Sequence, residues 1–272
     1  MVKIIAEIGI NHNGSIEDCK KMIMLSKVSG CDYVKIQKRN PDICVPEHQK
    51  SVMRQTPWGE MTYLEYKYKI EFNEKQIKEL CHYAKEIGIE FFASVWDLDS
   101  INIMKKYSNI GKIGSALIND LELCKAARNA FETLIVSTGM STEEEIKSCI
   151  EACNPDVIMH TNSTYPCPVE ELNLQYITWL KDKYPNKEVG YSGHEYGLVT
   201  TYCACGLGAE WVERHITLDR NTWGSDQSSS IEPDGLIKLV KGIRCIEKAC
   251  QYKPGPRKQF HGENIKKNSL RK

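Results

Sequence analysis

This 272-residue sequence lacks membrane-spanning runs, a secretion signal and an excess of either charge. No apolar run approaches the roughly 18 residues of a membrane span, and the amino terminus enters a strand-like run without a signal peptide. Lys plus Arg and Asp plus Glu number 36 each, so no net field attracts nucleic acid or an acidic membrane. These absences predict a cytoplasmic protein whose partners are small molecules or other proteins.

The 12 cysteines also lack the spacing of a zinc finger. Most fall within runs of helical periodicity, including Cys81, Cys124, Cys149, Cys153, Cys245 and Cys250, while Cys203 and Cys205 lie in an expected crossover segment. Free cysteine behaves as a small hydrophobic residue. We therefore expect buried free thiols and a reducing compartment.

The sequence does contain a short apolar run followed by an amphipathic run, repeated eight times. The expected strands span residues 3–10, 32–38, 90–96, 111–115, 133–138, 156–162, 188–192 and 211–216. The expected helices span residues 16–29, 73–87, 98–107, 119–130, 141–153, 169–183, 196–207 and 233–250. This alternation predicts a parallel sheet, and eight units close a barrel. The predicted fold is α/β, a single (β/α)8 TIM barrel over residues 1–252 with a basic tail over residues 253–272.

Two expectations concern the connections. Asn73 to Gln76 and Ser141 to Glu144 have the spacing of helix-capping boxes. The 39–71 segment shows no obvious element before Met61, and connections of such length are usually functional or disordered. The aromatic residues around Trp58 favour an ordered lid.

Polar side chains stand at the carboxyl ends of the expected strands, where the active sites of such barrels lie. They are Glu7, Lys35 with Gln37, Ser94, Lys112 with Ser115, Ser137, Ser163 with Tyr165, Ser192 with His194, and His215. Two convergent neutral imidazoles suit zinc, manganese or iron. A lysine inside an apolar run must be paired, so Lys35 and Lys112 indicate a bound phosphate or carboxylate. Taken alone, each histidine also fits a hydrogen-bonded strand-end residue, and each lysine an exposed residue at a frayed end.

Seven motifs at these strand ends resemble the N-acetylneuraminate (sialic acid) synthase family, whose members are barrel enzymes that condense phosphoenolpyruvate (PEP) with a sugar. The motifs are Ala-Glu-Ile-Gly-Ile-Asn-His-Asn-Gly (6–14), Val-Lys-Ile-Gln (34–37), Lys-Ile-Gly-Ser (112–115), Ser-Thr-Gly-Met (137–140), Ser-Thr-Tyr-Pro (163–166), Gly-Tyr-Ser-Gly-His (190–194) and Glu-Arg-His (213–215). They occur in the family's order, and each lies at an expected strand end.

The resemblance implies a role for each matching residue. His194 and His215 match the ligands of a divalent metal ion, Mn2+ or Mg2+, and Glu7 matches the catalytic carboxylate. Positions that bind PEP are matched by Lys35, Ser94, Lys112, Ser115, Ser137, Ser163 and Ser192, and positions that face the sugar by Gln37, Tyr165 and Asp226. The implied reaction joins PEP to an aldose similar to N-acetylmannosamine and yields phosphate and a nonulosonic (sialic-acid-like) 3-deoxy-2-keto sugar acid. The resemblance also implies a homo-oligomer.

The sequence departs from the family pattern in several places. Longer members carry a C-terminal antifreeze-like domain that supplies an arginine to the neighbouring subunit's sugar pocket, and this chain ends before such a domain could fit. Leu117 stands where longer members often have an acid, and residues 93–97 and 224–230 also differ. The pattern resembles a short, barrel-only branch and leaves the aldose open. Two alternatives also remain, a Schiff-base pyruvate aldolase that uses Lys35 or Lys112 and a non-catalytic sugar-binding paralogue.

Overall fold

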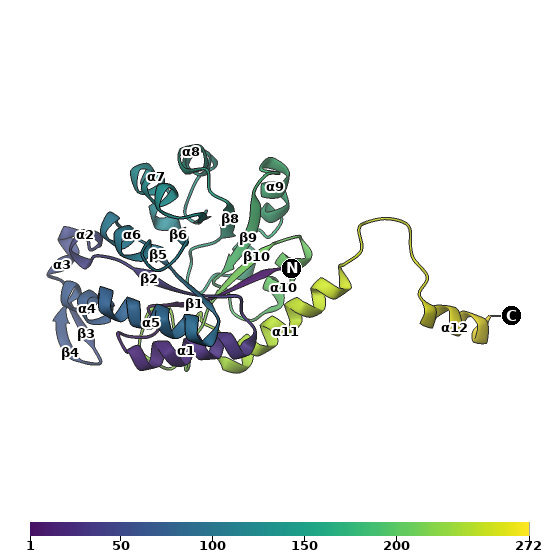
Figure 1. The fold of residues 1–272 in the computed structure, drawn as a ribbon, viewed down its shortest axis with the longest axis horizontal. Helices are drawn as coiled ribbons and strands as arrows, with labels where there is room; N and C mark the ends of the chain where they lie inside the picture. Colours follow the sequence, from purple (N-terminus) through teal and green to yellow (C-terminus); the bar gives the residue numbers. More distant parts are fainter. Residues whose placement is uncertain (272) are drawn as a thin grey trace.

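The computed structural model describes residues 1–271, and its main feature is a closed barrel of parallel strands (Figure 1). The barrel strands are β1 (Lys3–Gly9), β2 (Tyr33–Lys38), β5 (Glu90–Val95), β6 (Ile110–Ile113), β7 (Thr133–Ser137), β8 (Val157–Thr161), β9 (Glu188–Gly193) and β10 (Trp211–His215). Each strand pairs with the next one along the barrel, and β1 closes it between β2 and β10. The predicted (β/α)8 barrel is confirmed.

The predicted helices that follow the strands are also present. They are α1 (Ile16–Ser29), α5 (Glu74–Ile87), α6 (Leu98–Met104), α7 (Leu121–Ala130), α8 (Glu143–Cys153), α9 (Tyr176–Lys183), α10 (Val199–Gly206) and α11 (Pro233–Ala249). The largest error concerns α9, which was expected from residue 169. Residues Val169–Glu171 instead form a separate 3-10 turn (η2), because Asn173 has a left-handed backbone (φ 44°) that no α-helix accommodates.

One of the two capping predictions is right. Asn73 and Gln76 form the capping box of α5. The box of α8 begins one residue later than expected, at Thr142 with Glu145. The Ser141 hydroxyl instead donates to the Gly139 carbonyl oxygen at 3.1 Å.

The 39–71 segment is ordered, as predicted, but the expectation that it has no element before Met61 was wrong. It contains α2 (Pro41–Cys44), α3 (Glu47–Lys50), the hairpin of β3 (Met53–Thr56) and β4 (Gly59–Thr62), and α4 (Tyr63–Ile70). These elements are too short to produce a recognisable hydrophobic period. Tyr66 and Ile70 of α4 pack against Ile10, which fixes the segment beside the end of β1.

The prediction of free thiols is confirmed for all the cysteines, but the prediction of burial holds only for some of them. Cys203, Cys245 and Cys250 are exposed on or next to the outward faces of α10 and α11. The sulfur atoms of Cys124, Cys149 and Cys153 lie within 4.8 Å of one another. They fill the interface between α7 and α8.

The chain beyond α11 lies outside the barrel. Residues 251–271 are exposed throughout, and α12 (His261–Leu270) stands apart from the other helices in Figure 1. No helix among residues 1–271 is long and apolar enough to cross a bilayer.

A buried ion pair joins β10 to the connection that follows β9. The Arg214 guanidinium lies 3.1 Å from the Glu195 carboxylate and donates to the Thr201 hydroxyl at 2.7 Å and the Gly197 carbonyl oxygen at 2.9 Å. Both charged side chains are almost fully buried. The Arg214–Glu195 ion pair thus fixes the position of the segment that follows His194.

Replacement of Glu195 by alanine should lower the free energy of unfolding by about 3–5 kcal/mol, because it leaves a buried guanidinium without its counter-charge. Denaturant unfolding monitored by circular dichroism measures the change. Glu122→Ala is the control, since the ion pair of Glu122 with Lys125 is exposed and should contribute less than about 1 kcal/mol. Equal losses in the two variants would contradict the structural role of the buried pair.

Candidate active site

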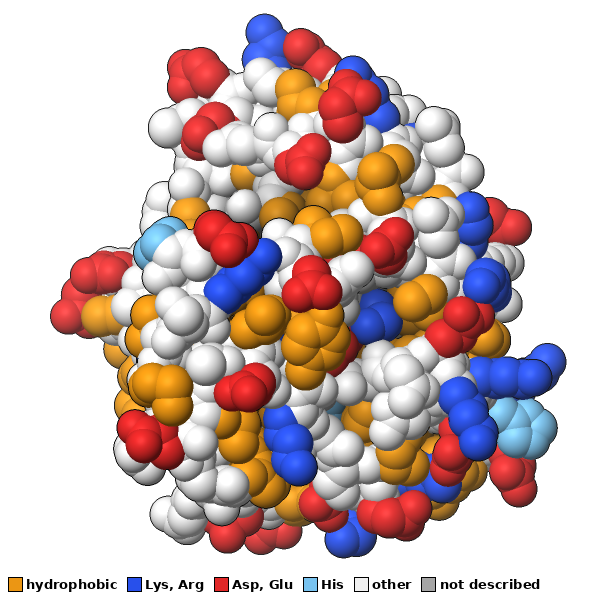
Figure 2. Space-filling model, turned by 90° about the vertical axis from the view of Figure 1, so that its left-hand side faces the viewer, with side chains coloured by type: hydrophobic (Ala, Val, Ile, Leu, Met, Phe, Trp, Pro, Cys, Tyr) orange, Lys and Arg blue, Asp and Glu red, His pale blue; other side chains and the backbone are white. Residues whose placement is uncertain are grey.

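A cavity of about 270 Å3 opens at the carboxyl ends of the barrel strands. Figure 2 views the side of the molecule that carries the 39–71 segment, and a hollow near its centre leads to charged and histidine side chains. The cavity is lined by twelve of the thirteen residues expected at the site, Asp226 being the exception: Glu7, Lys35, Gln37, Ser94, Lys112, Ser115, Ser137, Ser163, Tyr165, Ser192, His194 and His215. Thr161, Trp96 and Glu213 complete much of the wall.

The alternation of side chains along each strand explains why these residues meet. Side chains two residues apart point to the same face of a strand. Ile5, Phe92, Ile135, Met159 and Trp211 pack together in one buried cluster inside the barrel. The residues two positions further along are Glu7, Ser94, Ser137, Thr161 and Glu213, so an apolar floor lies beneath a polar layer.

The register of the strands then sets the neighbours within the polar layer. Glu7 pairs in register with Lys35 on one side and with His215 on the other. Ser94 pairs with Lys112. The Glu7 carboxylate therefore lies between the Lys35 ammonium and the His215 imidazole.

Both lysines form buried ion pairs. Lys35 Nζ lies 2.6 Å from Glu7 Oε2 and donates to Ser94 Oγ at 2.8 Å. Lys112 Nζ lies 2.7 Å from Glu213 Oε1. The exposed fractions of Lys35 and Lys112 are 1% and 3%, so the alternative of exposed lysines at frayed strand ends was wrong.

Glu213 is the main site residue that the sequence interpretation missed. It lies within the Glu-Arg-His motif and two residues before His215, a spacing that indicates the same face of β10. Burial raises the pKa of Glu213, but the ammonium groups of Lys112 and Lys35 outweigh this effect and bring the pKa to about 2. The two lysines and two glutamates thus form a buried layer that is electrically balanced.

His194 and His215 face each other with ring centroids 5.4 Å apart. His194 Nδ1 lies 2.7 Å from the Asn162 carbonyl oxygen, so Nδ1 carries the proton and Nε2 keeps a lone pair. Burial, with a smaller contribution from His215, lowers the pKa of His194 to about 3, which keeps the imidazole neutral.

His215 Nδ1 is buried and has no hydrogen-bond partner among residues 1–271. The Asp226 carboxylate oxygen lies 3.8 Å from it. A buried nitrogen without a partner is costly unless a ligand satisfies it. Imidazole and carboxylate groups are common ligands of divalent metals, so two imidazoles next to a carboxylate fit a divalent ion.

The sequence matches the NeuB family over residues 22–254. The chain belongs to the NeuB family. The N-acetylneuraminate-9-phosphate synthase of Drosophila melanogaster is 37% identical over 89% of this chain and 67% of its own length. The N,N'-diacetyllegionaminic acid synthase of Campylobacter jejuni is 34% identical over 90% of this chain and 76% of its own length.

A solved structure supports the same family assignment. The N-acetylneuraminic acid synthetase from Leptospira borgpetersenii superposes with a TM-score of 0.87 at 30% identity and covers 99% of this chain and 92% of the other. The resemblance based on seven strand-end motifs is therefore confirmed as family membership.

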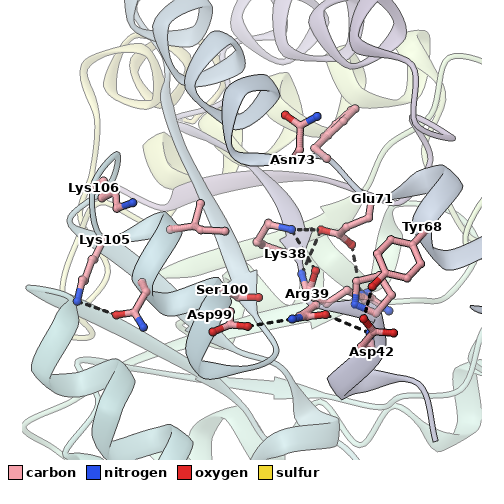
Figure 3. Close-up of a pocket in the computed structure, with 15 residues that line it drawn as sticks. Lys38, Arg39, Asp42, Tyr68, Glu71, Asn73, Asp99, Ser100, Lys105 and Lys106 are labelled. Atoms are coloured by element: carbon pink, nitrogen blue, oxygen red, sulfur yellow. Dashed lines mark hydrogen bonds and ion pairs between the residues drawn. The ribbon is translucent and has the colours of Figure 1, made fainter. Parts of the chain in front are cut away.

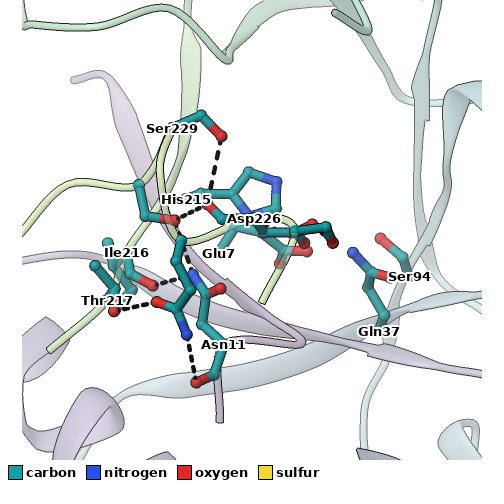
Figure 4. Close-up of polar contacts among 12 residues, drawn as sticks. Glu7, Asn11, Gln37, Ser94, His215, Ile216, Thr217, Asp226 and Ser229 are labelled. Carbon is teal, nitrogen blue, oxygen red and sulfur yellow. Dashed lines mark hydrogen bonds and ion pairs between the residues drawn. The ribbon is translucent and has the colours of Figure 1, made fainter. Parts of the chain in front are cut away.

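In this NeuB chain, Asn11 of the first motif holds the loop that carries Asp226 (Figure 4). Asn11 Nδ2 donates to the Ile216 carbonyl oxygen at 2.8 Å and to Ser230 Oγ at 2.7 Å. The Ser230 hydroxyl donates in turn to the Asp226 carbonyl oxygen at 2.6 Å. This network places Asp226 beside His215, although the two residues are separated by ten positions of irregular chain.

Gly9 of the same motif leaves the space in which His215 and Asp226 meet. Its backbone is left-handed (φ +56°), and an added Cβ would lie 3.2 Å from His215 Cε1 and 3.3 Å from the Asp226 carboxylate. Glycine is the residue that fits such a conformation at such close range. The first NeuB motif thus shapes the histidine side of the pocket as well as supplying Glu7.

Proposed function

We propose that this chain is a PEP-dependent condensing synthase that joins PEP to an aldose similar to N-acetylmannosamine and releases phosphate and a nonulosonic (sialic-acid-like) 3-deoxy-2-keto sugar acid. The observation that carries the proposal is the single pocket in which two buried lysines lie next to two histidines, in a chain of the NeuB family. Relatives that support it bear the names N-acetylneuraminate-9-phosphate, legionaminic acid and pseudaminic acid synthase.

Lys35 and Lys112 would bind the phosphate and carboxylate of PEP. The serines around them supply neutral donors for the remaining oxygens: Ser94, Ser115, Ser137, Ser163 and Ser192. Ser137 Oγ is buried without a partner among residues 1–271, and Ser115 Oγ accepts the Gly139 amide at 3.0 Å, which leaves its proton free to donate. Charge-assisted hydrogen bonds of this kind are the strong ones.

His194 and His215 would hold a divalent ion, Mn2+ or Mg2+. When bound, the ion acts as a Lewis acid that polarises the aldehyde oxygen of the aldose. Gln37, Tyr165 and Asp226 would orient the sugar. Tyr165 already packs its ring 4.0 Å from that of His194, centroid to centroid.

The bond changes are those of an aldol-type addition. PEP C3 attacks the aldehyde carbon and forms the new C–C bond, water adds at C2, and the tetrahedral species loses phosphate by C–O cleavage. Glu7 would take the proton from the attacking water and return one to the departing phosphate. Glu7 lies between Lys35 and His215, so under this proposal it would stand where bound PEP and the metal meet.

PEP labelled with 18O in its bridging oxygen tests this proposal directly. C–O cleavage transfers the label to the released phosphate, which mass spectrometry detects. A label that stays in pyruvate would mean P–O cleavage by a phosphatase-like activity and would contradict the proposed reaction.

The Schiff-base aldolase is the second candidate, and it needs a neutral lysine. Burial lowers the pKa of Lys112, which favours this alternative, whereas the Glu213 carboxylate opposes the shift. The carboxylates at 2.6 Å and 2.7 Å stabilise both lysines as ammonium ions. Borohydride in the presence of pyruvate should therefore leave no covalent adduct, and an adduct on either lysine would establish the aldolase. A non-catalytic paralogue would bind a sugar but release no phosphate from PEP.

Replacement of Lys112 by methionine should weaken PEP binding by one to several kcal/mol, roughly the cost of losing a buried charge contact. The same change removes the nearer of the two ammonium groups beside Glu213 and leaves Lys35 at 3.8 Å, so it should also destabilise the fold. The double variant Lys112→Met, Glu213→Gln removes that second effect. Calorimetric titration with PEP measures both variants, and an unchanged affinity in the double variant would contradict the role of Lys112.

Several expectations remain predictions. Homo-oligomer assembly, a cytoplasmic location and the absence of nucleic-acid and membrane partners follow from sequence and family resemblance alone.

A further inference from the structure

Three cysteine sulfur atoms converge in the helix layer, and none of them lines the active-site cavity. Cys149 and Cys153 lie four residues apart in α8, so their side chains project from the same face of that helix. Cys124 of α7 meets them from the neighbouring helix. We call Cys124, Cys149 and Cys153 the sulfur trio. All three are free thiols with an exposed fraction of 1% or less.

The separations within the sulfur trio suit a single bound ion. The Cys149 sulfur lies 3.7 Å from the Cys124 sulfur and 3.8 Å from the Cys153 sulfur, and all three lie within 4.8 Å of one another. A metal ion with thiolates about 2.3 Å away on three sides holds the sulfurs about 4.0 Å apart. A disulfide would instead require two sulfurs at about 2.05 Å. An ion at the centre of the trio therefore requires little movement of the side chains.

The interactions within the sulfur trio favour one thiolate. Hydrogen bonds with the Cys124 and Cys149 thiols lower the pKa of Cys153, and the positive charges of Arg128 and Lys187 lower it further, while burial opposes them. The same sharing of protons raises the pKa of Cys149. The thiolate is the form of cysteine that binds metals. A bound ion would displace the remaining thiol protons.

The ligands of the sulfur trio are soft and three in number. Among residues 1–271, no fourth His, Cys, Asp or Glu side chain joins the group. The carbonyl oxygens of Leu117 and Ile118 lie 3.7 Å and 3.8 Å from the Cys124 sulfur. Structural zinc sites are almost always four-coordinate, whereas thiolates alone select soft ions such as Cu+. The trio therefore favours Cu+ over Zn2+.

The cavity beside the 39–71 segment is a different kind of feature (Figure 3). Its volume is about 840 Å3, and residues of that segment and of α6 line it. Lys38 Nζ lies 2.7 Å from the Glu71 carboxylate, and Lys106 Nζ lies 2.8 Å from that of Glu74. These cations already have carboxylate partners, so they give no indication of a ligand.

We propose that the sulfur trio binds one thiophilic d10 metal ion, Cu+ in preference to Zn2+, and that this ion joins α7 to α8 as a structural site. The two helices follow β6 and β7, adjacent strands that carry Lys112 and Ser137 of the active site. The ion would stabilise the helix layer behind that part of the barrel and take no part in the reaction. If the thiols served only as small hydrophobic side chains, no ion would bind.

The test uses the full chain with its three exposed cysteines replaced, Cys203→Ser, Cys245→Ser and Cys250→Ser, so that surface thiols do not contribute. Cu+ is added without oxygen, both to the folded protein and during refolding, in competition with a chromophoric Cu+ chelator. One equivalent should bind and raise the unfolding temperature, because the ion binds the folded state. Zn2+ added in the same way should bind more weakly.

Cys149→Ser removes the sulfur that contacts the other two. Removal of a group that merely orients a metal ligand costs about 10- to 100-fold in affinity. Loss of a ligand should therefore weaken Cu+ binding by at least about 100-fold and abolish the rise in unfolding temperature. Cys19→Ser is the matched control, because Cys19 is a buried cysteine of α1 outside the trio, and it should leave Cu+ affinity unchanged. Cys149→Ala serves the same purpose if the serine variant does not fold.

Cd2+ supplies a second readout that separates the sulfur trio from the histidine pair of the active site. Bonds from Cd2+ to thiolates produce an ultraviolet charge-transfer absorption that bonds to imidazole or carboxylate do not. This absorption should appear with one equivalent of Cd2+ and be lost in Cys149→Ser. Absence of saturable Cu+ binding, or equal binding by Cys149→Ser and the unaltered trio, would overturn the proposal. Tighter binding of Zn2+ than of Cu+ would overturn the choice of ion.

Discussion

Replacement of His215 by alanine should abolish Mn2+ binding and reduce the release of phosphate from PEP by at least about 1,000-fold, while the barrel stays folded. The rate loss follows because polarisation of the aldehyde by a metal is worth several kcal/mol. The fold should survive because His215 Nδ1 makes no hydrogen bond among residues 1–271, so its removal leaves no buried partner unsatisfied. Electron paramagnetic resonance of Mn2+ measures binding without reference to turnover.

The exposed His82 of α5 provides the matched control for this experiment. His82→Ala removes an imidazole from the helix layer and should alter neither Mn2+ binding nor turnover. Normal turnover of His215→Ala in the presence of a chelator would contradict the metal assignment. Loss of the far-ultraviolet circular dichroism signal in His215→Ala would instead assign the residue to the fold.

Replacement of Glu7 by glutamine should lower kcat by about 100- to 10,000-fold, the usual contribution of a general acid–base group. Glutamine keeps the shape and an oxygen that can accept from Lys35, whose Nζ lies 2.6 Å from Glu7 Oε2. It cannot take a proton from water. Removal of the negative charge also frees Lys35 for an anion, so PEP should bind as tightly as before or more tightly.

Two measurements separate these effects. Single-turnover kinetics report the loss in the chemical step, and calorimetry reports PEP affinity. A fall in PEP affinity with unchanged kcat would assign Glu7 to binding. An unchanged rate in both measurements would exclude Glu7 from the chemistry.

The barrel was predictable because its signal is local and repeated. On the inward face of several strands, a core residue is followed two positions later by a residue of the pocket, as Ile5 is by Glu7 and Phe92 by Ser94. The apolar floor and the polar layer therefore follow from the same period. Helices α5, α7 and α11 have clear amphipathic spacing, and α5 also has a capping box. Strand order then follows from the short connections of a parallel barrel.

The features that escaped prediction depend on contacts distant in sequence. The spacing of Glu213 from His215 indicates the same face of β10, but its pairing with Lys112, 101 positions earlier in the chain, follows only from the fold. Lys67 reads as an ordinary helix lysine until α4 packs against Ile10 and buries it. The single-turn helices α2 and α3 carry too few residues for any period to appear.

The most direct test of the central claim is the release of phosphate from PEP with Mn2+ present, with and without chelator. The acceptors are N-acetylmannosamine, its 6-phosphate, mannose and arabinose 5-phosphate. The proposed function predicts release that requires one of these or a related aldose and stops when chelator is added. Failure of the protein to bind PEP at all would contradict it, because the two lysines and the serines around them would then serve the barrel and not a substrate.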